Sequence, residues 1–351
     1  MTDKPASADG TEPLLEIRDL RTYFHGEDSI AKAVDGVSYR VGKRRTLGIV
    51  GESGSGKSVT ALSVMRLVQK PAGRIASGEI LFKGRDLLKL SEREIRKIRG
   101  NQISMIFQEP MTSLNPVFTI GDQIGEVFRI HRKMSRKESL KEAVRMLELV
   151  RIPAAATRVH DYPHQMSGGM RQRVMIAMAL GCNPDLLIAD EPTTALDVTV
   201  QAQILDLMAG LKETYGSSIL MITHDLGVIA EISDEVAVMY AGQIVEYAKT
   251  DDLFETPMHP YTMGLLESRP RLSDSIEHTR LTPILGSVPS PTKHPTGCRF
   301  HPRCPFSTQE CHNEAPEMRE LMPGHTVRCH WAEKILEGKA NRHTAEMRVL
   351  G

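Results

Sequence analysis

The eight residues GESGSGKS, numbers 51 to 58, fit the pattern G-x-x-x-x-G-K-[ST]. The residues before them, 46–50, read as a short buried strand, and residues 59–67 read as a helix, which is the context that this pattern requires. Glycines let backbone N–H groups turn inward around an anion, and a helix N-terminus adds partial positive charge. The stretch therefore predicts a loop that binds phosphates.

Each position of this loop has a predicted task. Lys57 is expected to reach the β- and γ-phosphates of a nucleotide, and the hydroxyl of Ser58 is expected to ligate Mg²⁺. The residues predicted to bind the nucleotide here are Gly51, Glu52, Ser53, Gly54, Ser55, Gly56, Lys57, Ser58 and Val59.

The length of 351 residues predicts a large domain and a smaller one. Residues 1–13 are small and polar and are expected to form a flexible tail. Beyond about residue 255 prolines gather and the apolar periodicity weakens. We therefore expect a nucleotide-binding domain over 14–255 and a C-terminal extension over 256–351.

Charge and hydropathy exclude several classes of protein. Lys and Arg number 44, as do Asp and Glu, so the formal net charge is zero, which argues against nucleic acid as a partner. The sequence has no run of about 18 apolar residues and no charged-then-apolar N-terminal signal. These features predict a cytosolic chain that does not span a membrane.

Polar side chains follow several apolar strands. The alternation of strands and helices predicts an α/β sheet whose ligand lies at the carboxyl ends of the strands. Asp190 ends an apolar strand and is the candidate acid for Mg²⁺, and Glu191 beside it is the candidate general base toward water. Gln108 and His224 also follow strands. We expect Gln108 to contact Mg²⁺ or the water, and His224 to hydrogen-bond the γ-phosphate.

Two further places offer nucleotide contacts. Ser167, Gly168 and Gly169 open a helix, so their neighbourhood exposes N–H donors suited to a second anion site. Tyr23 and Phe24 follow a predicted strand, and an aromatic ring there suits stacking on an adenine base, although packing is the more common use of such a ring.

In order along the chain, the phosphate loop, Gln108, Ser167-Gly168-Gly169, Asp190-Glu191, Leu196-Asp197 and His224 resemble the motif set of ABC ATPases over residues 14 to 250. The resemblance implies an α/β P-loop NTPase fold. Its parts are a RecA-like core, an antiparallel β subdomain and a helical subdomain over about 110–180, followed here by a small irregular C-terminal domain. The signature reads Met-Ser-Gly-Gly-Met, which departs from the common Leu-Ser-Gly-Gly-Gln but keeps the serine and glycines.

The resemblance also implies a mechanism. ABC ATPases dimerise head to tail, so ATP lies between the phosphate loop of one subunit and Ser167 and Gly169 of the other. It implies catalytic roles for Glu191, His224 and Gln108, Mg²⁺ ligands in Ser58, Gln108 and Asp190, adenine stacking by Phe24 or less readily Tyr23, and an interface position for Asp197.

A narrower resemblance concerns the sequences FQEPMTSLNP at residues 107–116 and HPYT at residues 259–262. Both are similar to the ATPases of oligopeptide and dipeptide importers. This implies a peripheral subunit on the cytoplasmic face of the membrane. Its partners would be a second ATPase subunit, two transmembrane permease subunits and, indirectly, a substrate-binding protein outside. Importers of nickel, opines or sugars have similar sequence features and are the alternative within the transporters. An ABC ATPase that acts on DNA or ribosomes is the alternative of another functional class.

Four of the five cysteines lie in the extension: Cys298, Cys304, Cys311 and Cys329. In a reducing cytosol such a cluster favours metal or redox chemistry over structural disulfides. Their spacing lacks the short Cys-x₂₋₄-Cys pairs of zinc sites and also differs from ferredoxin spacings. The extension resembles that of peptide-importer subunits, some of which hold a [4Fe–4S] cluster. A cluster is our prediction, with zinc or free thiols as alternatives.

Overall fold

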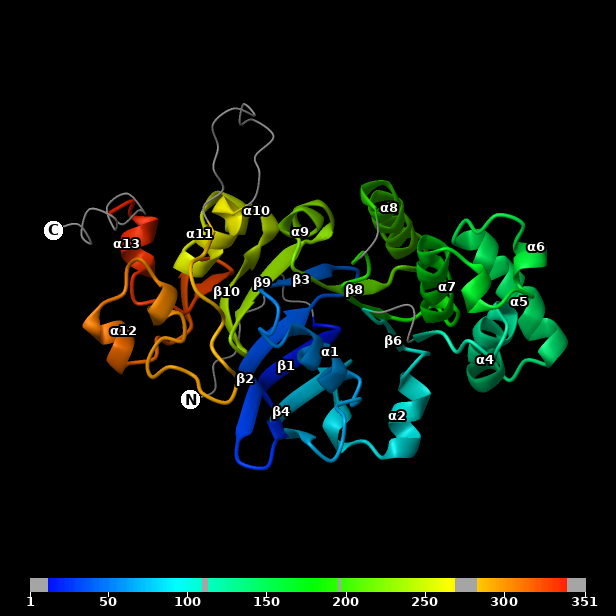
Figure 1. Cartoon of the computed structure of the whole chain (residues 1–351), viewed down its shortest axis with the longest axis horizontal. Helices are drawn as coiled ribbons and strands as arrows, with labels where there is room; N and C mark the ends of the chain where they lie inside the picture. The colour runs from blue at the N-terminus through cyan, green and yellow to red at the C-terminus, as the bar shows by residue number, and fades with distance from the viewer. Residues whose placement is uncertain (1–11, 109–112, 195–196, 269–282, 340–351) are drawn as a thin grey trace. The chain divides into compact units, whose positions relative to one another are not determined.

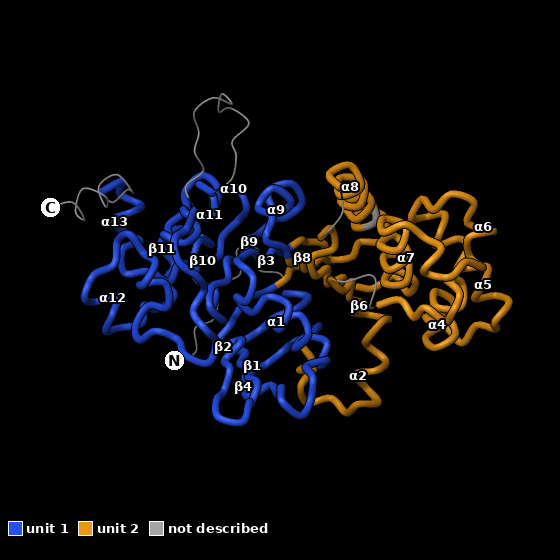
Figure 2. The backbone as a smooth tube through the Cα atoms, in the orientation of Figure 1, with its two compact units in different colours: residues 1–40, 47–83, 223–351 blue, residues 41–46, 84–222 orange. Residues whose placement is uncertain are grey.

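The computed structural model describes residues 12–108, 113–194, 197–268 and 283–339. The chain divides into two compact units, which Figure 2 distinguishes by colour. Unit 1 comprises residues 1–40, 47–83 and 223–351, and unit 2 comprises residues 41–46 and 84–222. The predicted domain boundary near residue 255 stays a prediction.

Unit 1 contains an antiparallel sheet in which β1 (Leu15–His25) lies between β2 (Ile30–Val41) and β4 (Gly73–Phe82). In the register of β1 and β4, Leu15 pairs with Phe82 and Phe24 pairs with Gly73. Alternate side chains of β1 are buried, as a strand with one face on the core requires. This sheet is the antiparallel subdomain that the resemblance implied.

The second sheet of unit 1 carries the phosphate loop. Its strand order is β11 (Arg319–Met322), β12 (His325–Val327), β10 (Gln243–Lys249), β9 (Glu235–Tyr240) and β3 (Thr46–Val50). The pair β3 and β9 is parallel, and β9 forms an antiparallel hairpin with β10. All five residues of β3 are buried.

Helices of unit 1 flank these strands (Figure 1). They are α1 (Lys57–Val64), α9 (Leu226–Ile232), α10 (Thr250–Glu255), α11 (Pro260–Glu267), α12 (Gln309–Asn313) and α13 (Ala332–Leu336), with a 3₁₀ turn η3 at His301–Arg303. The helix α10 packs on α9, β9 and β10. The helix predicted over 59–67 corresponds to α1, which begins two residues earlier and ends three residues earlier than predicted.

The C-terminal extension is less irregular than predicted. Its hairpin β11–β12 joins the sheet, because Glu246 and Tyr247 of β10 pair with Val327 and Thr326 of β12. The Glu246 carboxylate, which is fully buried, accepts hydrogen bonds from Met258 N (2.6 Å) and His259 N (3.0 Å). It also lies 2.8 Å from His325 Nε2. One buried acid on β10 thus anchors both the start of α11 and the strand β12.

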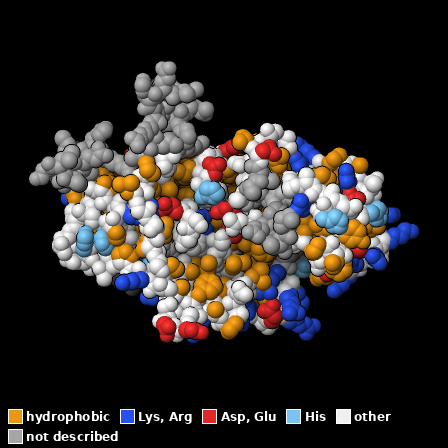
Figure 3. Space-filling view, in the orientation of Figure 1, with side chains coloured by type: hydrophobic (Ala, Val, Ile, Leu, Met, Phe, Trp, Pro, Cys, Tyr) orange, Lys and Arg blue, Asp and Glu red, His pale blue; other side chains and the backbone are white. Residues whose placement is uncertain are grey.

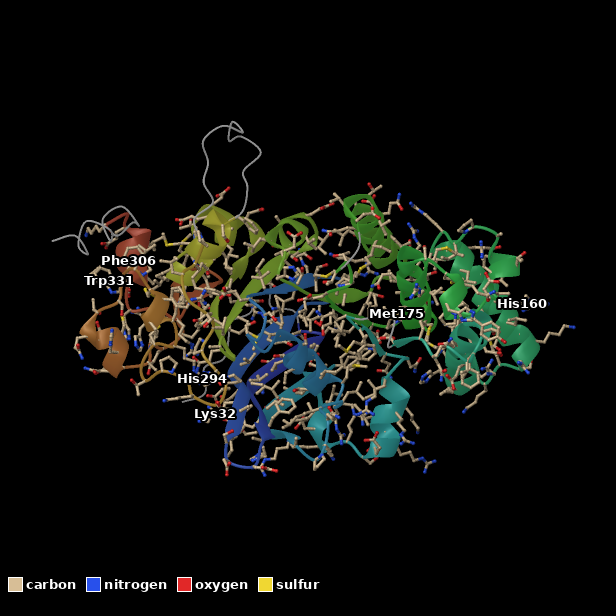
Figure 4. All side chains as sticks on the ribbon, in the orientation of Figure 1. Lys32, His160, Met175, His294, Phe306 and Trp331 are labelled. Carbon is tan, nitrogen blue, oxygen red and sulfur yellow. The ribbon has the colours of Figure 1, made fainter. Side chains whose placement is uncertain are left out.

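The extension also runs along β2. Lys32 N donates to Pro291 O at 2.8 Å, and the ring of His294 meets Lys32 O at 3.3 Å (Figure 4). Further along, the rings of Phe306 and Trp331 lie 6.2 Å apart, and Trp331 also packs beside Met258, Val327 and Ala332. The apolar residues of the extension therefore form a small core of their own within unit 1.

Unit 2 contains three parallel strands in the order β8 (Ser218–Thr223), β7 (Leu186–Asp190) and β6 (Ile103–Ile106). Parallel strands covered on both faces are expected to be continuously apolar. All five residues of β7 and all six of β8 are buried. Their carboxyl ends carry the polar residues that the sequence singled out. In the chain, a short strand β5 (Arg85–Asp86) and a 3₁₀ turn η1 (Leu87–Lys89) precede these three strands.

The helices of unit 2 are α2 (Glu92–Ile98), α4 (Ile120–Arg132), α5 (Arg136–Leu149), α6 (Ala155–Arg158), α7 (Gly168–Leu180) and α8 (Val198–Tyr215), with a 3₁₀ turn η2 at Pro163–Gln165. The helices α4, α5 and α7 pack on one another. Capping boxes at Ser91 and Ser135 fix the starts of α2 and α5. The helical span 120–180 lies within the predicted helical subdomain.

Candidate functional site

The phosphate loop follows β3 and ends in α1. Its last glycine, Gly56, is the N-cap of α1 with φ +104°, and a Cβ at this position would lie 2.2 Å from the carbonyl oxygen of Ala33. At Gly51 a Cβ would lie 2.1 Å from Met239 O. The loop can therefore take this path only with glycine at both positions. Gly56 supplies no capping side chain, so the first-turn N–H groups of α1 are donors suited to phosphate oxygens.

Lys57 lies folded onto the loop. Its side chain is buried, and Nζ donates to Gly51 O (2.7 Å) and Glu52 O (3.0 Å). The same Glu52 carbonyl accepts from Ser55 N at 3.2 Å, which closes the turn. The ammonium of Lys57 is thus held at the loop by neutral carbonyl acceptors, which are weaker partners for a cation than charged oxygens.

Residues of the C-terminal part of the chain hold Glu52, and the sequence reasoning missed them. Arg303 forms a two-bond ion pair with the Glu52 carboxylate, and Tyr261 Oη accepts from Glu52 N at 2.8 Å. The HPYT sequence pointed to this region, but no local pattern connects residue 52 with residue 303.

The two rings that are candidates for stacking on adenine, Tyr23 and Phe24, differ in the contacts that hold them. The Tyr23 hydroxyl donates to Asp35 Oδ1 at 2.6 Å, and burial is the main cause that raises the pKa of this phenol. Phe24 is half-buried at the end of β1, where it packs against Gly73. The ring of Tyr23 is thus held by a hydrogen bond, whereas that of Phe24 is not, and stacking of either ring on adenine stays a prediction.

In unit 2, the structure brings Gln108 and Glu191 together. Gln108 Nε2 donates to Glu191 Oε2 at 3.0 Å, and Thr194 Oγ1 donates to the same oxygen at 2.9 Å. Glu191 has φ +47°, an unusual conformation for a residue with a Cβ. Asp190, the preceding residue, ends β7 and is 4% exposed. Asp190 is thus buried and Glu191 half-buried, so the two carboxylates have different environments.

The serine–glycine–glycine sequence begins α7. Ser167 is the N-cap, its Oγ accepts from Met170 N at 3.3 Å, and both Ser167 and Gly168 are exposed. A Cβ at Gly168 would meet open space, so Gly168 offers its backbone at the surface. Asp197 caps α8 in the same way, since its Oδ1 accepts from Val200 N at 2.9 Å. Leu196 and residues 109–112 of the second resemblance lie outside the described residues.

His224 belongs to unit 1 by the division of the chain. It follows β8 directly and is exposed, and Asp225 beside it caps α9. Phe24, the phosphate loop and His224 are thus in unit 1, whereas Gln108, Ser167, Asp190, Glu191 and Asp197 are in unit 2.

The four cysteines of the extension are free thiols. Trp331 N donates to Cys329 Sγ at 3.3 Å, and Thr308 Oγ1 lies 3.4 Å from Cys311 Sγ. Burial raises the pKa of Cys298 and of Cys329, and that of Cys304 to about 12. Among the described residues, no three His, Cys, Asp or Glu side chains are placed to hold a metal ion. The donor chemistry suits a soft metal, but the arrangement is not an assembled site.

A hollow of about 430 Å³ lies in unit 2, away from the predicted nucleotide residues of that unit. Basic side chains of α2 and of the end of α4 line it, and Figure 3 shows Lys and Arg side chains over α2. Glu92 at its rim pairs with Arg96 and Arg99. The hollow is shallow and exposed, and none of the predicted site residues lines it.

Comparison with known proteins decides the family. Residues 34–194 match the family model described as ABC transporter. The Probable peptide ABC transporter ATP-binding protein y4tR of Sinorhizobium fredii is 54% identical over 323 residues, which covers 92% of this chain and 96% of that protein. The chain belongs to the ATP-binding subunits of ABC transporters.

Further matches agree with this ABC ATPase assignment. The Oligopeptide transport ATP-binding protein AppD of Bacillus subtilis is 54% identical over 316 residues, 90% of this chain and 96% of that protein. Residues 245–311 match the model described as Oligopeptide/dipeptide transporter, C-terminal region. That match covers the HPYT sequence and three of the four cysteines of the extension.

Solved structures confirm the fold. The ATP-binding cassette MJ0796, in a dimeric post-hydrolysis state bound to ADP and Pi, is 26% identical with a TM-score of 0.61, covering 67% of this chain and 98% of that one. The ABC transporter component cbiO1 of Clostridium perfringens has a TM-score of 0.58 at 24% identity. The predicted P-loop ABC ATPase fold and the ATP-hydrolase activity of the ABC ATPase are thus confirmed. No helix within the described ranges is long and apolar enough to cross a membrane.

Proposed function

We propose that this ABC ATPase hydrolyses ATP to drive the import of dipeptides or oligopeptides. The observation that carries the proposal is the match of residues 245–311 to the oligopeptide/dipeptide transporter region, on a chain that is 54% identical to AppD over nearly its whole length. Importers of nickel, opines or other small solutes are the alternative within this family. An ABC ATPase that does not transport is the alternative outside it.

The proposed chemistry assigns a task to each residue at the strand ends. Mg²⁺, when bound, neutralises charge that develops on the transferred phosphoryl group. Its proposed ligands, Ser58, Asp190 and the amide oxygen of Gln108, are the hard oxygen donors that this ion prefers. Lys57 binds the phosphates, and the Gly56–Lys57 helix start supplies N–H donors to them.

Glu191 is the proposed general base. Its carboxylate accepts hydrogen bonds from Gln108 and Thr194, which orient it while leaving it the capacity to take a proton from water. The amide nitrogen of Gln108 makes this contact, so the amide oxygen of the same side chain is the atom proposed for Mg²⁺. His224, exposed after β8, is the proposed hydrogen-bond donor to the γ-phosphate.

A second ATPase subunit completes the proposed site. Ser167, Gly168 and Asp197 lie exposed at helix starts, where they suit contact with nucleotide or phosphate loop of another subunit. MJ0796 is dimeric in solved structures, one of them bound to ADP and Pi.

Membrane partners follow from the transporter proposal. Apolar side chains close in sequence to Gln108 are exposed, with Val117 at 71% and Phe118 at 53%. Exposed apolar groups of this size mark contact surfaces. We propose that this segment meets two transmembrane permease subunits on the cytoplasmic face of the membrane, and that a substrate-binding protein outside delivers the peptide.

Uptake by cells tests the transport proposal. A strain that lacks this gene is expected to lose uptake of labelled di- and oligopeptides, and the wild-type gene, but not one encoding Glu191→Gln, is expected to restore it. Uptake of nickel in the same strains is the control. Loss of nickel uptake with normal peptide uptake would support the alternative substrate and overturn the peptide assignment.

We also propose, on donor chemistry alone, that Cys298, Cys304, Cys311 and Cys329 bind a [4Fe–4S] cluster, with zinc as the alternative. The sulfurs would have to move together, because as they stand they do not form a metal site. Protein purified without oxygen is expected to be brown with broad visible absorbance, and Cys298→Ser is expected to bleach it. A colourless preparation that contains neither iron nor zinc would refute both forms of the proposal.

A further inference from the structure

We infer that Arg303 and Tyr261 are positioning residues for ATP binding, because they hold Glu52, the second residue of the phosphate loop, in place and neutralise its charge. The inference rests on the proposed binding of ATP phosphates by this loop. It gives the C-terminal extension a task in nucleotide binding. All the residues involved belong to unit 1.

The Arg303 guanidinium grips the Glu52 carboxylate with two parallel bonds, Nη1 to Oε2 at 2.6 Å and Nη2 to Oε1 at 3.0 Å. The arginine side chain is 4% exposed and the glutamate side chain 31% exposed. Arg303 Nε donates to Leu285 O at 2.9 Å, so the guanidinium is itself fixed. A bidentate, charge-assisted pair with a buried partner is among the stronger polar contacts of a protein and defines an orientation.

An aromatic cluster supports this arginine. The rings of Tyr240, Tyr261 and Phe300 have centroids 4.6 to 5.4 Å apart, and all three are buried. The Arg303 guanidinium lies 5.8 Å from the centroid of Tyr240 and 6.0 Å from that of Phe300. The cluster joins β9, α11 and the turn before η3. Arg303 therefore projects from a packed core rather than from a loose tail.

Tyr261 fixes the backbone of the same loop residue. Its hydroxyl accepts from Glu52 N at 2.8 Å, and the side chain is fully buried. His259 caps α11 through Nδ1, which accepts from Tyr261 N at 3.0 Å, and so places Tyr261 in the first turn of that helix. Glu52 is thus held by its carboxylate from η3 and by its N–H from α11.

The position of Glu52 matters because Lys57 rests on it. Lys57 Nζ donates to Glu52 O at 3.0 Å, and Ser55 N donates to the same oxygen. A shift of the Glu52 peptide would move the acceptor that places the lysine for the phosphates. The contact chain runs from Arg303 and Tyr261 through Glu52 to Lys57.

The negative charge of Glu52 is the second reason why we expect Arg303 to matter for ATP binding. A carboxylate in a phosphate-binding loop repels the triphosphate, since like charges separated by several ångströms cost energy, more so where water is partly excluded. Pairing with Arg303 cancels this charge. Without Arg303, Glu52 would be an unneutralised anion in a site that must accept another.

A second arginine of the extension acts on the loop indirectly, through the turn between β9 and β10. Arg299 pairs with Asp35, and its Nη1 donates to Ala241 O at 2.6 Å. The next residue, Gly242, donates from N to Ser55 O at 2.9 Å. Arg299 therefore holds the β9–β10 turn against the loop, so the extension supports the loop at Glu52 and at Ser55.

Binding of the non-hydrolysable ATP analogue AMP-PNP with Mg²⁺ to the full-length chain tests the inference. Arg303→Ala is expected to raise the Kd roughly tenfold or more, as loss of a bidentate charged contact would. In ATPase assays the same variant should raise KM for ATP by a similar factor while kcat changes little. Tyr261→Phe is expected to raise the Kd several-fold, less than Arg303→Ala.

A double variant that regains AMP-PNP affinity would show that Arg303 acts by neutralising Glu52, and that its loss does not simply damage the fold. Glu52→Gln removes the carboxylate, so the double variant Glu52→Gln with Arg303→Ala is expected to bind AMP-PNP within about threefold of wild type, a non-additive result for residues in contact. Arg319→Ala is the matched control, because Arg319 pairs with Glu333 within the same extension. Its Kd is expected to equal that of wild type.

Each possible outcome either supports the inference or overturns it. Wild-type affinity in Arg303→Ala, a Kd in Arg319→Ala as high as in Arg303→Ala, or a double variant no better than Arg303→Ala would each overturn the inference. Thermal unfolding of every variant shows whether the chain is folded, and Arg303→Lys, which keeps the charge but not the fork, is expected to fall between wild type and Arg303→Ala. A wild-type chain that binds no AMP-PNP would instead defeat the proposed ATP-binding role of the loop.

Discussion

Two glutamates of the candidate site, Glu52 and Glu191, are held in opposite ways. Glu52 is bound by Arg303 and Tyr261, both nearly or fully buried. Glu191 accepts from Gln108 and Thr194, which are exposed, and its own backbone is in the left-handed region. Water competes well for exposed hydrogen bonds and poorly for buried ones. The phosphate loop is therefore fixed before nucleotide binds, whereas the carboxylate of Glu191 can exchange its partners for water.

The largest expected effect concerns Glu191, whose hydrogen-bond partners are exposed. Glu191→Gln keeps the size of the side chain and an acceptor for Gln108 and Thr194, but it removes the base. We expect ATP hydrolysis to fall by roughly 10²- to 10⁴-fold while ATP affinity is kept. Steady-state ATPase rates and AMP-PNP titration measure the two quantities. Glu213→Gln, on the exposed side of α8, is the control, and near-normal hydrolysis in Glu191→Gln would end the role of Glu191 as base.

The fixed loop predicts a steric effect. Gly56→Ala places a Cβ 2.2 Å from Ala33 O in a backbone with φ +104°, so the loop must move. We expect ATP affinity to fall by about 10²-fold, equivalent to about 3 kcal/mol of lost binding, since strain and the shifted N–H donors act together. Gly54→Ala is the matched control, because it has φ +81° but open space around its Cβ. Equal losses in the two variants would contradict a sterically fixed loop.

Sequence patterns predicted local features well and distant pairings poorly. The phosphate loop and the Asp190-Glu191 pair are contiguous. Residues 136–149 carry apolar residues at helical spacing, at positions 140, 144 and 147, and helix α5 has the same bounds. On that helix, however, Ala143 and Met146 are buried with Leu147, while Leu140 and Val144 are half-buried, because tertiary packing decides which side of an apolar stripe faces inward. The hairpin β11–β12 was missed, since strands of four and three residues carry too short a pattern to recognise.

The contacts of Glu52 show the same limit at the site. Its partners lie 209 and 251 residues along the chain, and an arginine in a proline-rich extension reads as a surface charge. The sequence did mark Tyr261 as part of a family-like motif, but its task became visible only when β9, α11 and η3 were seen to share one aromatic cluster.

Acid is expected to loosen the support of the loop. Burial, with Arg328 adding to it, lowers the pKa of His259 to about 3. The unfolded chain binds a proton at this residue below its ordinary pKa of about 6.5, whereas the folded chain does not until near 3, so stability falls as pH drops through this window. From pH 7 to pH 5 the free energy of unfolding should fall by about 2 kcal/mol from this residue.

Urea unfolding at the two pH values measures this loss. His259→Asn keeps a side-chain acceptor at the N-cap of α11 but cannot titrate. The variant is therefore expected to lose about 2 kcal/mol less than wild type between pH 7 and pH 5. An identical pH dependence in the two proteins would show that His259 is not the group responsible.

The smallest expected effect probes how Glu191 is oriented. Gln108→Ala removes the donor to Glu191 Oε2 and leaves Thr194 as a donor to the same oxygen. Because one exposed hydrogen bond contributes about 1 kcal/mol, we expect kcat to fall roughly five- to tenfold with ATP affinity nearly unchanged. Gln102→Ala is the control, since Gln102 begins the same strand region and offers its backbone carbonyl to Leu186 N. A loss in Gln108→Ala as large as in Glu191→Gln would contradict this expectation and would show that the proposed contact of Gln108 with Mg²⁺ contributes more than its contact with Glu191.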